Sequence, residues 1–125
     1  MPMVEKMYRI SARPETRAIA GLSMGGGQSL NIGLTHLELF HWIGVFSSGL
    51  PRNGDPEQIF ADLFANPAAS NKKIKLLWIG IGRRFESAQR LTELLHRHEI
   101  EFAFHPSEGR HAWNVWRHYL SEFAP

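Results

Sequence analysis

The sequence contains no cysteine, and this absence excludes two classes of site. Without thiols the chain forms neither disulfide bonds nor metal sites built on thiolate ligands. The absence of cysteine also leaves undecided whether the protein works in an oxidising or a reducing compartment, because disulfide usage is the feature that would indicate it. The histidines do not indicate a metal site either. His96 and His98 have no acidic or thiol partner that suggests a metal site, so we expect them to be solvated on a helix face, with no metal bound.

Long hydrophobic runs are also missing. The first residues, Met1-Pro2-Met3-Val4-Glu5-Lys6, lack the apolar core of a signal peptide, and no later segment approaches the length of a membrane span. We therefore expect a soluble protein with no membrane partner. The expected location is the cytoplasm, or outside the cell if a leader has been removed.

Strong net charge is the third absence. The formal charge is only +2, and the basic residues are scattered apart from the pairs Lys72-Lys73 and Arg83-Arg84. The pI of about 9.3 is therefore weak support for a nucleic-acid partner, and we expect none. With 125 residues, of which 43% are hydrophobic, the chain suits one domain over residues 1–125. No repeat, low-complexity tract or linker divides it.

What the sequence does contain is a regular alternation of apolar runs and amphipathic segments. The runs predict four short strands, and the segments predict helices between and after them. The first strand is almost wholly apolar, which is typical of a strand buried on both faces of a parallel sheet. Such alternation predicts an α/β fold with about four parallel strands and helices on both faces. The expected strands are 17–22, 41–47, 74–81 and 101–105, and the expected helices are 2–8, 24–37, 57–64, 87–98 and 112–123.

The pentapeptide Gly21-Leu22-Ser23-Met24-Gly25 joins the first strand to the first long helix. It fits the G-x-S-x-G nucleophile elbow, in which a serine lies on a sharp strand-to-helix turn. Gly21 and Gly25 have no side chain, which allows the strand and the helix to pass close together. The turn exposes the serine oxygen and places it at a helix N-terminus, where N–H groups favour developing negative charge.

Less specific interpretations exist for the same residues. Ser23 is also a suitable helix N-cap, and His111 is also suited to a surface loop. Gly25-Gly26-Gly27 invites comparison with a phosphate-binding loop, but the Lys-Ser/Thr of that motif is absent. Trp113 and Trp116 are expected in the core or in a pocket wall rather than on a sugar-binding surface.

Three polar candidates follow strand ends: Ser23 after the first strand, Glu86 after the third and His111 after the fourth. Sites in open parallel sheets form at the carboxyl ends of the strands, so these residues are expected near one another. Their order, serine, acid, histidine, is that of an α/β-hydrolase triad. Serine needs an imidazole to take its proton, and the imidazole needs a carboxylate to fix its tautomer and stabilise its cation.

Several blocks in this order resemble the esterase branch of the α/β-hydrolases. This branch includes feruloyl and acetyl xylan esterases of carbohydrate esterase family one, enterochelin-esterase-like proteins and S-formylglutathione hydrolases. The resemblance implies that Ser23 is the nucleophile, that His111 is the general base, and that the Met24 N–H contributes to the oxyanion hole. It implies no cofactor. The blocks are Ala18-Ile19-Ala20-Gly21-Leu22-Ser23-Met24-Gly25-Gly26-Gly27, Phe46-Ser47-Ser48, Leu77-Trp78-Ile79-Gly80 and Glu108-Gly109-Arg110-His111-Ala112-Trp113.

The chain departs from the family pattern in two ways. It has about half the usual length and resembles only the C-terminal half, so it is expected to be a truncated α/β-hydrolase whose first strand has an unpaired edge. The missing half normally bears the second oxyanion N–H. The turn Gly82-Arg83-Arg84-Phe85-Glu86-Ser87 also lacks the family aspartate. Glu86 is the nearest carboxylate, and it is equally well placed to serve as a favourable charge at a helix start.

These observations predict a serine carboxylesterase that hydrolyses a feruloyl, acetyl or other small acyl ester, either free or attached to a polysaccharide. The alternative is a catalytically impaired remnant of a hydrolase that acts as an oligomerising or binding protein. Both interpretations predict a homodimer or a higher homo-oligomer, because an open sheet edge and uncovered apolar faces require a partner surface.

Overall fold

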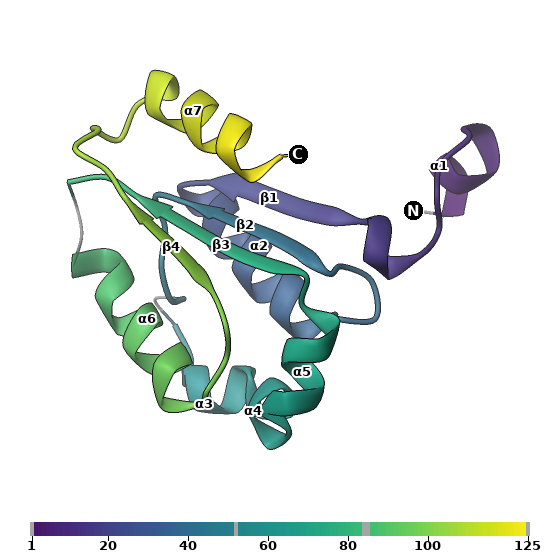
Figure 1. Ribbon diagram of the computed structural model, residues 1–125, viewed down its shortest axis with the longest axis horizontal. Helices are drawn as coiled ribbons and strands as arrows, with labels where there is room; N and C mark the ends of the chain where they lie inside the picture. The colour runs from purple at the N-terminus through teal and green to yellow at the C-terminus, as the bar shows by residue number, and fades with distance from the viewer. Residues whose placement is uncertain (1, 52, 84–85, 125) are drawn as a thin grey trace.

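Four parallel strands form the centre of the molecule (Figure 1). The structure is a computed structural model that describes residues 2–51, 53–83 and 86–124. The strands are neighbours in space in the same order as in the sequence, β1-β2-β3-β4. This confirms the predicted α/β class and the number of strands. Their bounds are Ala18–Leu22 for β1, Trp42–Phe46 for β2, Leu76–Ile81 for β3 and Ala103–Pro106 for β4.

Helices cover both faces of this sheet, as expected, but unequally (Figure 1). Each crossover moves one strand along in the same direction, and right-handed crossovers then place every connecting helix on the same face. The C-terminal helix α7 (Trp113–Phe123) follows β4 and, among the described helices, is the one that packs on the opposite face. The connecting helices are α2 (Met24–Thr35), α3 (Pro56–Ile59), α4 (Ala61–Ala65), α5 (Pro67–Lys73) and α6 (Glu86–Arg97).

Alternation along the strands divides the core into two clusters. In β2, Ile43 and Val45 are fully buried against the connecting helices, whereas Phe46 points to the α7 side. The α7 side is aromatic: Phe46 and Trp78 meet edge to face, with ring centroids 5.3 Å apart. Tyr119 of α7 completes this cluster and is 1% exposed. Both faces of the central strands are therefore dry, which holds the carboxyl ends of β1 to β4 in a fixed arrangement.

The segment between β2 and β3 differs from the predicted single helix over 57–64. The helix breaks at Phe60, and a further helix, α5, follows directly instead of the expected helix end at Asn66-Pro67. The side chain of Asn66 accepts a hydrogen bond from the Ala69 N–H at 3.1 Å, and proline occupies the first helical position. Asparagine before proline is an N-terminal signal as well as a breaker, and here it starts a helix.

The first strand also differs from expectation. It is an edge strand of the described sheet, and its residues are exposed or half-buried, so the prediction that it is buried on both faces was wrong. Hydrophobicity alone does not distinguish a central strand from an edge strand.

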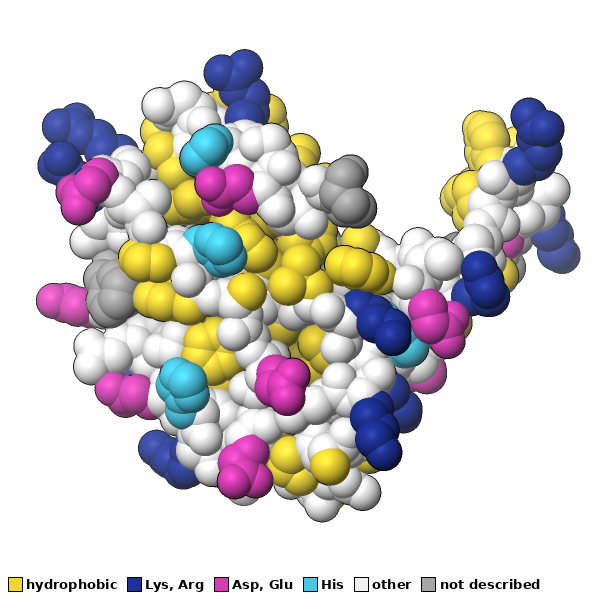
Figure 2. Space-filling view, viewed as in Figure 1, with side chains coloured by type: hydrophobic (Ala, Val, Ile, Leu, Met, Phe, Trp, Pro, Cys, Tyr) yellow, Lys and Arg dark blue, Asp and Glu magenta, His cyan; other side chains and the backbone are white. Residues whose placement is uncertain are grey.

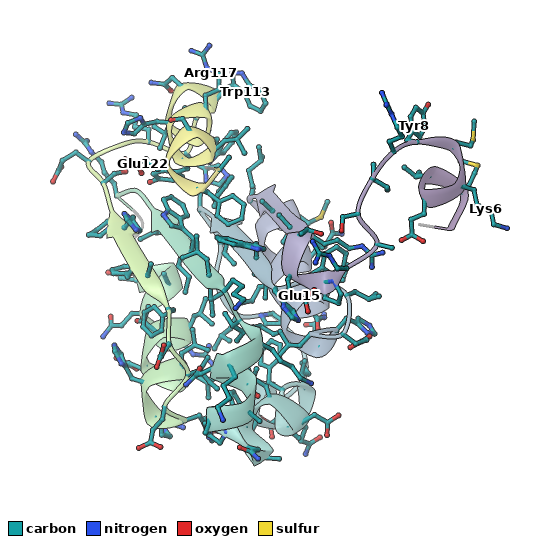
Figure 3. All side chains as sticks on the ribbon, turned by 45° about the vertical axis from the view of Figure 1, so that its right-hand side comes forward. Lys6, Tyr8, Glu15, Trp113, Arg117 and Glu122 are labelled. Carbon is teal, nitrogen blue, oxygen red and sulfur yellow. The ribbon has the colours of Figure 1, made fainter. Side chains whose placement is uncertain are left out.

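Before β1, the short helices α1 (Pro2–Met7) and η1 (Pro14–Thr16) form an arm that projects from the sheet (Figure 1). A salt bridge between Glu5 and Arg17 ties the arm to the start of β1. Figure 3 shows Lys6 and Tyr8 at the outer part of this arm, apart from the strands. Within the described residues, none of the helices has the length and apolarity needed to cross a membrane.

Candidate active site

Ser23 lies at the turn between β1 and α2, and its backbone is strained. Its φ of 54° and ψ of −120° lie in a region that non-glycine residues rarely adopt. The Ser23 N–H donates to the Phe46 carbonyl at 2.8 Å, which fixes the turn to the end of β2. Ser23 occupies the N-cap position of α2, but its side chain makes no capping hydrogen bond to the helix. The strained turn leaves the hydroxyl available for another partner.

The glycines around Ser23 have different tasks. A Cβ on Gly21 would lie 2.3 Å from the carbonyl oxygen of Gly25, so the strand and the first turn of α2 pass within backbone contact. A Cβ on Gly25 would meet nothing within 4 Å, which does not support the expectation that its own side chain must be small. The second constrained position is Gly26, where a Cβ would lie 2.9 Å from the Phe46 carbonyl oxygen.

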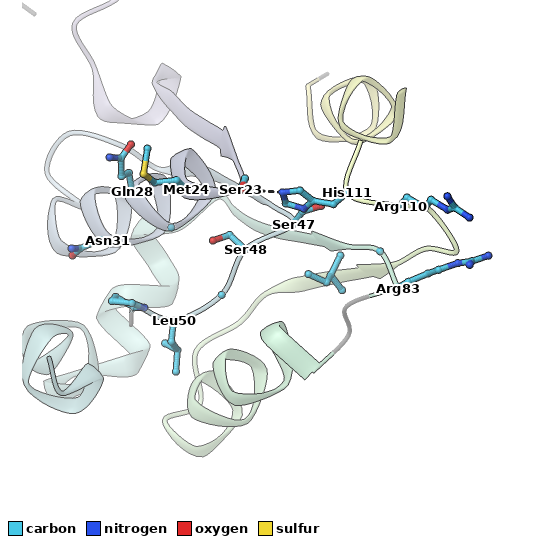
Figure 4. Close-up of a pocket in the computed structure, with 15 residues that line it drawn as sticks. Ser23, Met24, Gln28, Asn31, Ser47, Ser48, Leu50, Arg83, Arg110 and His111 are labelled. Carbon is cyan, nitrogen blue, oxygen red and sulfur yellow. Dashed lines mark hydrogen bonds between the residues drawn. The ribbon is translucent and has the colours of Figure 1, made fainter. Parts of the chain in front are cut away.

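The partner of the serine hydroxyl is His111. The imidazole Nε2 lies 3.0 Å from Ser23 Oγ, although 88 residues separate the two in the sequence. Figure 4 shows this hydrogen bond between the turn after β1 and the loop that follows β4. The contact has the geometry that a general base needs in order to take a serine proton. Two of the sequence-predicted site residues are therefore brought together.

The loop that carries His111 is held by the turn after β3. The backbone N–H of Arg83 donates to the Gly109 carbonyl at 3.0 Å, and its guanidinium Nε donates to the Glu108 carbonyl at 3.1 Å. Gly82 makes this approach possible, because a Cβ there would lie 2.2 Å from the Gly109 oxygen. From the sequence, this arginine was notable only for its position in the turn that lacks the family aspartate. Its structural role is to hold the loop before His111.

Trp116 is a second residue whose role sequence reasoning missed. As expected for the core or a pocket wall, it packs against the aromatic cluster beside α7, and its indole ring also lies against His111, with ring centroids 4.8 Å apart and planes at 90°. Its indole N–H donates to Ser47 Oγ at 3.0 Å. The signal available in the sequence was position: Trp116 is one turn into the helix that follows His111, and Ser47 ends a strand.

A cleft of about 1070 Å³ opens beside the serine and histidine. Figure 4 shows α2 on one side, with Met24 and Gln28, and Arg83 and Arg110 on the other. Met24 is the first residue of α2, where backbone N–H groups have no partner within the helix, so its N–H is available to a developing negative charge. None of the described residues lining the cleft is a carboxylate, and its charged side chains are the two arginines.

Glu86 is not brought into this cleft. It is the exposed first residue of α6 and is not one of the described residues lining the cleft. Arg84 and Phe85, which fill the middle of the predicted acid turn, lie outside the described residues. Across 2–51, 53–83 and 86–124, no group of three or more His, Cys, Asp or Glu side chains is arranged to hold a metal ion.

The whole chain, residues 1–125, matches the family model described as Putative esterase. The chain belongs to this family. An endo-1,4-beta-xylanase/feruloyl esterase of Xylanibacter ruminicola is 29% identical over 127 residues, which cover 99% of this chain and 16% of that protein.

Solved structures of esterases share the fold. A carbohydrate esterase family one ferulic acid esterase from Anaeromyces mucronatus, in complex with ferulic acid, has a TM-score of 0.78 and 24% identity, over 98% of this chain and 48% of that one. An S-formylglutathione hydrolase from Staphylococcus aureus has a TM-score of 0.75 and 22% identity, over 97% and 54%. The chain thus spans about half the length of these structures, and a much smaller share of the Xylanibacter protein.

Proposed function

We propose that the chain is a carboxylic ester hydrolase that works through an acyl-enzyme on Ser23. The observation that carries this proposal is the 3.0 Å contact between Ser23 Oγ and His111 Nε2, formed at a strained turn beside an open cleft. A helix N-cap or a surface loop histidine needs no such pairing. Membership of the esterase family supports the reaction class.

Each step uses a group in the cleft. Ser23 Oγ attacks the ester carbonyl carbon while His111 Nε2 takes the hydroxyl proton. The Met24 N–H, at the N-terminus of α2, stabilises the oxyanion of the tetrahedral intermediate. The intermediate collapses, the C–O bond to the alcohol breaks, and the imidazolium returns its proton to the leaving alkoxide. Water then attacks the acyl-enzyme with His111 again acting as base, which releases the acid and the free serine.

The substrate we propose is a feruloyl, acetyl or other small acyl ester, free or linked to a polysaccharide. The related Xylanibacter protein is named for xylanase and feruloyl esterase activity, and the Anaeromyces structure holds ferulic acid. We further propose that the chain corresponds to the C-terminal half of the family fold. The order of Ser23 before His111, with three crossovers between them, supports that placement.

Hydrolysis of p-nitrophenyl acetate and p-nitrophenyl ferulate by the wild type, Ser23→Ala and His111→Ala tests the proposal. We expect the rate to fall by about a thousandfold or more in both variants, because nucleophile and base act as a unit. Equal rates in all three proteins would exclude Ser23 chemistry. Thermal unfolding of each variant serves as the control for folding.

The role of Glu86 as triad acid is a separate proposal, supported by its place in the order serine, acid, histidine. Its exposure argues for the favourable helix-start charge instead. Glu86→Gln, which keeps the size of the side chain and removes the charge, distinguishes the two. A fall in kcat of about tenfold or more would support the triad role. An unchanged kcat across pH, with a small loss of thermal stability, would assign Glu86 to the helix terminus.

A second proposal, that the chain self-associates, rests on its exposed apolar surface. Met3 and Met7 of α1 and the following Tyr8 are 69%, 66% and 63% exposed, and β1 is an edge of the described sheet. Figure 2 shows hydrophobic side chains on the projecting arm and between α7 and the strands. Burying such surface in a second copy of this chain is favourable. A stable monomer at micromolar concentration in light scattering would contradict it.

A further inference from the structure

The imidazole of a serine hydrolase must keep one nitrogen pointed at the nucleophile. In a triad, a carboxylate bonded to Nδ1 fixes this orientation. In the described part of the chain, no hydrogen bond reaches His111 Nδ1, and the cleft contains no carboxylate. His111 is nevertheless exposed and lies on a loop. Some other contact must therefore hold the ring in the orientation that meets Ser23.

Two sets of contacts hold His111: one acts on its main chain and the other on its ring. The hydrogen bonds from Arg83 to the carbonyls of Glu108 and Gly109 hold the main chain just before the histidine. They place its Cα but leave the side chain free to rotate. The ring itself touches Trp116, whose plane is perpendicular to it at a centroid separation of 4.8 Å. Such edge-to-face pairs have a preferred geometry, so the indole restricts rotation of the imidazole.

The indole can act in this way because it is itself fixed. Its N–H donates to Ser47 Oγ at 3.0 Å, across 69 residues of sequence. Ser47 is held in turn at the end of β2, where its N–H donates to the Gly80 carbonyl at 2.7 Å and its φ is 51°. The contacts run without interruption from the sheet through Ser47 and Trp116 to His111.

We propose that Trp116, anchored by Ser47, is a positioning residue that orients the His111 imidazole toward Ser23. The inference rests on the proposed esterase function and gives an uncharged side chain a part in orienting the imidazole, whether or not Glu86 also acts on it. Because an indole carries no charge, it fixes the ring without stabilising the imidazolium as a carboxylate does. Solvent around the exposed His111 screens that positive charge instead.

Trp116→Phe and Ser47→Ala, alone and combined, test the proposal. Phenylalanine keeps a ring beside His111 but loses the N–H, and alanine removes only the acceptor. We expect each variant to lower kcat and the rate of fluorophosphonate labelling of Ser23 by about tenfold. KM of Trp116→Phe should stay within about twofold, because Trp116 is not one of the described residues lining the cleft. The double variant should match the singles, because both changes break the same hydrogen bond.

The matched control is Trp113→Phe. This indole is 64% exposed on the same helix, and its ring lies edge to face with Trp116 at a centroid separation of 6.4 Å rather than against His111. Phenylalanine keeps a ring at that position. It should leave kcat unchanged. Multiplying effects of Trp116→Phe and Ser47→Ala, an equal loss in the Trp113 control, or wild-type kcat in both test variants would overturn the proposal. Thermal unfolding identifies a variant that fails to fold, and Ser47→Ala then carries the test.

A readout independent of turnover separates this proposal from the proposed function. Nitrogen NMR of protein labelled in histidine reports which ring nitrogen of His111 bears the proton. In the wild type we expect a single tautomer protonated at Nδ1, because a general base must present an unprotonated Nε2 to the Ser23 hydroxyl. Trp116→Phe and Ser47→Ala should give mixed tautomers. The same pure tautomer in both variants would refute the positioning role, even if the wild type hydrolyses no ester.

Discussion

Replacing Gly21 by alanine perturbs the elbow at the point where its backbone is most crowded. A Cβ there would lie 2.3 Å from the carbonyl oxygen of Gly25, and ordinary contact begins at 3.4 Å, so the two segments must separate by about 1 Å. The two nearest atoms, the Gly25 carbonyl oxygen and carbon, belong to the backbone, which cannot rotate away. We therefore expect a loss at the upper end of overpacking effects, about 3 kcal/mol. For 125 residues this corresponds to a fall in Tm of about 10 °C.

The same displacement acts on catalysis. Ser23 lies between the two segments that are forced apart, and a misplacement of about 1 Å can reduce a rate by about a hundredfold. We expect Gly21→Ala to lower kcat by that order while the protein still unfolds cooperatively. Differential scanning calorimetry measures the stability, and p-nitrophenyl acetate hydrolysis well below the Tm measures the rate.

Gly25→Ala is the matched control, because a Cβ there meets nothing within 4 Å and the residue lies in a helix. Alanine lowers the entropy of the unfolded chain and favours the helix, so this variant should gain about 0.5 kcal/mol, or about 2 °C. Equal stability of Gly21→Ala and the wild type, or a large loss in Gly25→Ala, would refute the steric account of the elbow.

Two further predictions concern the loop before His111 and the aromatic cluster. Arg83→Ala should lower kcat about tenfold, because it removes the hydrogen bond to the Glu108 carbonyl. Arg83→Lys should not restore kcat, because lysine lacks the planar guanidinium whose Nε–H makes this bond. Full activity of the lysine variant would contradict this prediction. Burial raises the pKa of the Tyr119 hydroxyl, and its hydrogen bond to Ser107 opposes this shift. The tyrosine of the unfolded state therefore ionises first, above about pH 10. As a result, the free energy of unfolding falls as the pH rises through the pKa of the folded state. Tyr119→Phe should cost about 1 kcal/mol at neutral pH and should lose less stability than the wild type in alkaline denaturation, whereas parallel alkaline curves would contradict the assignment.

The sequence predicts the parallel sheet and the position of its strand ends, because the local pattern along the chain is compatible with one arrangement. Apolar runs separated by amphipathic helices require a parallel sheet, and the carboxyl ends of its strands meet at one edge. That is why the sequence alone predicts that Ser23 and His111 lie close together. The strain at Ser23 follows from the same turn.

What the sequence could not supply depends on long-range packing. No local pattern shows that β1 lies at an edge, or that Asn66 starts a helix rather than ending one. The contact of Trp116 with His111 and the bonds from Arg83 to the loop depend on where two distant turns meet. These contacts decide how the histidine is held.

Trapping the acyl-enzyme shows whether Ser23 becomes acylated during turnover. The protein is mixed with p-nitrophenyl acetate, quenched in acid during the first turnover, and digested for mass spectrometry. We predict a burst of nitrophenol equal to the enzyme concentration and one acetyl group on the peptide that contains Ser23, with neither in Ser23→Ala. Acetyl on another residue, or hydrolysis that proceeds equally well in Ser23→Ala, would contradict it.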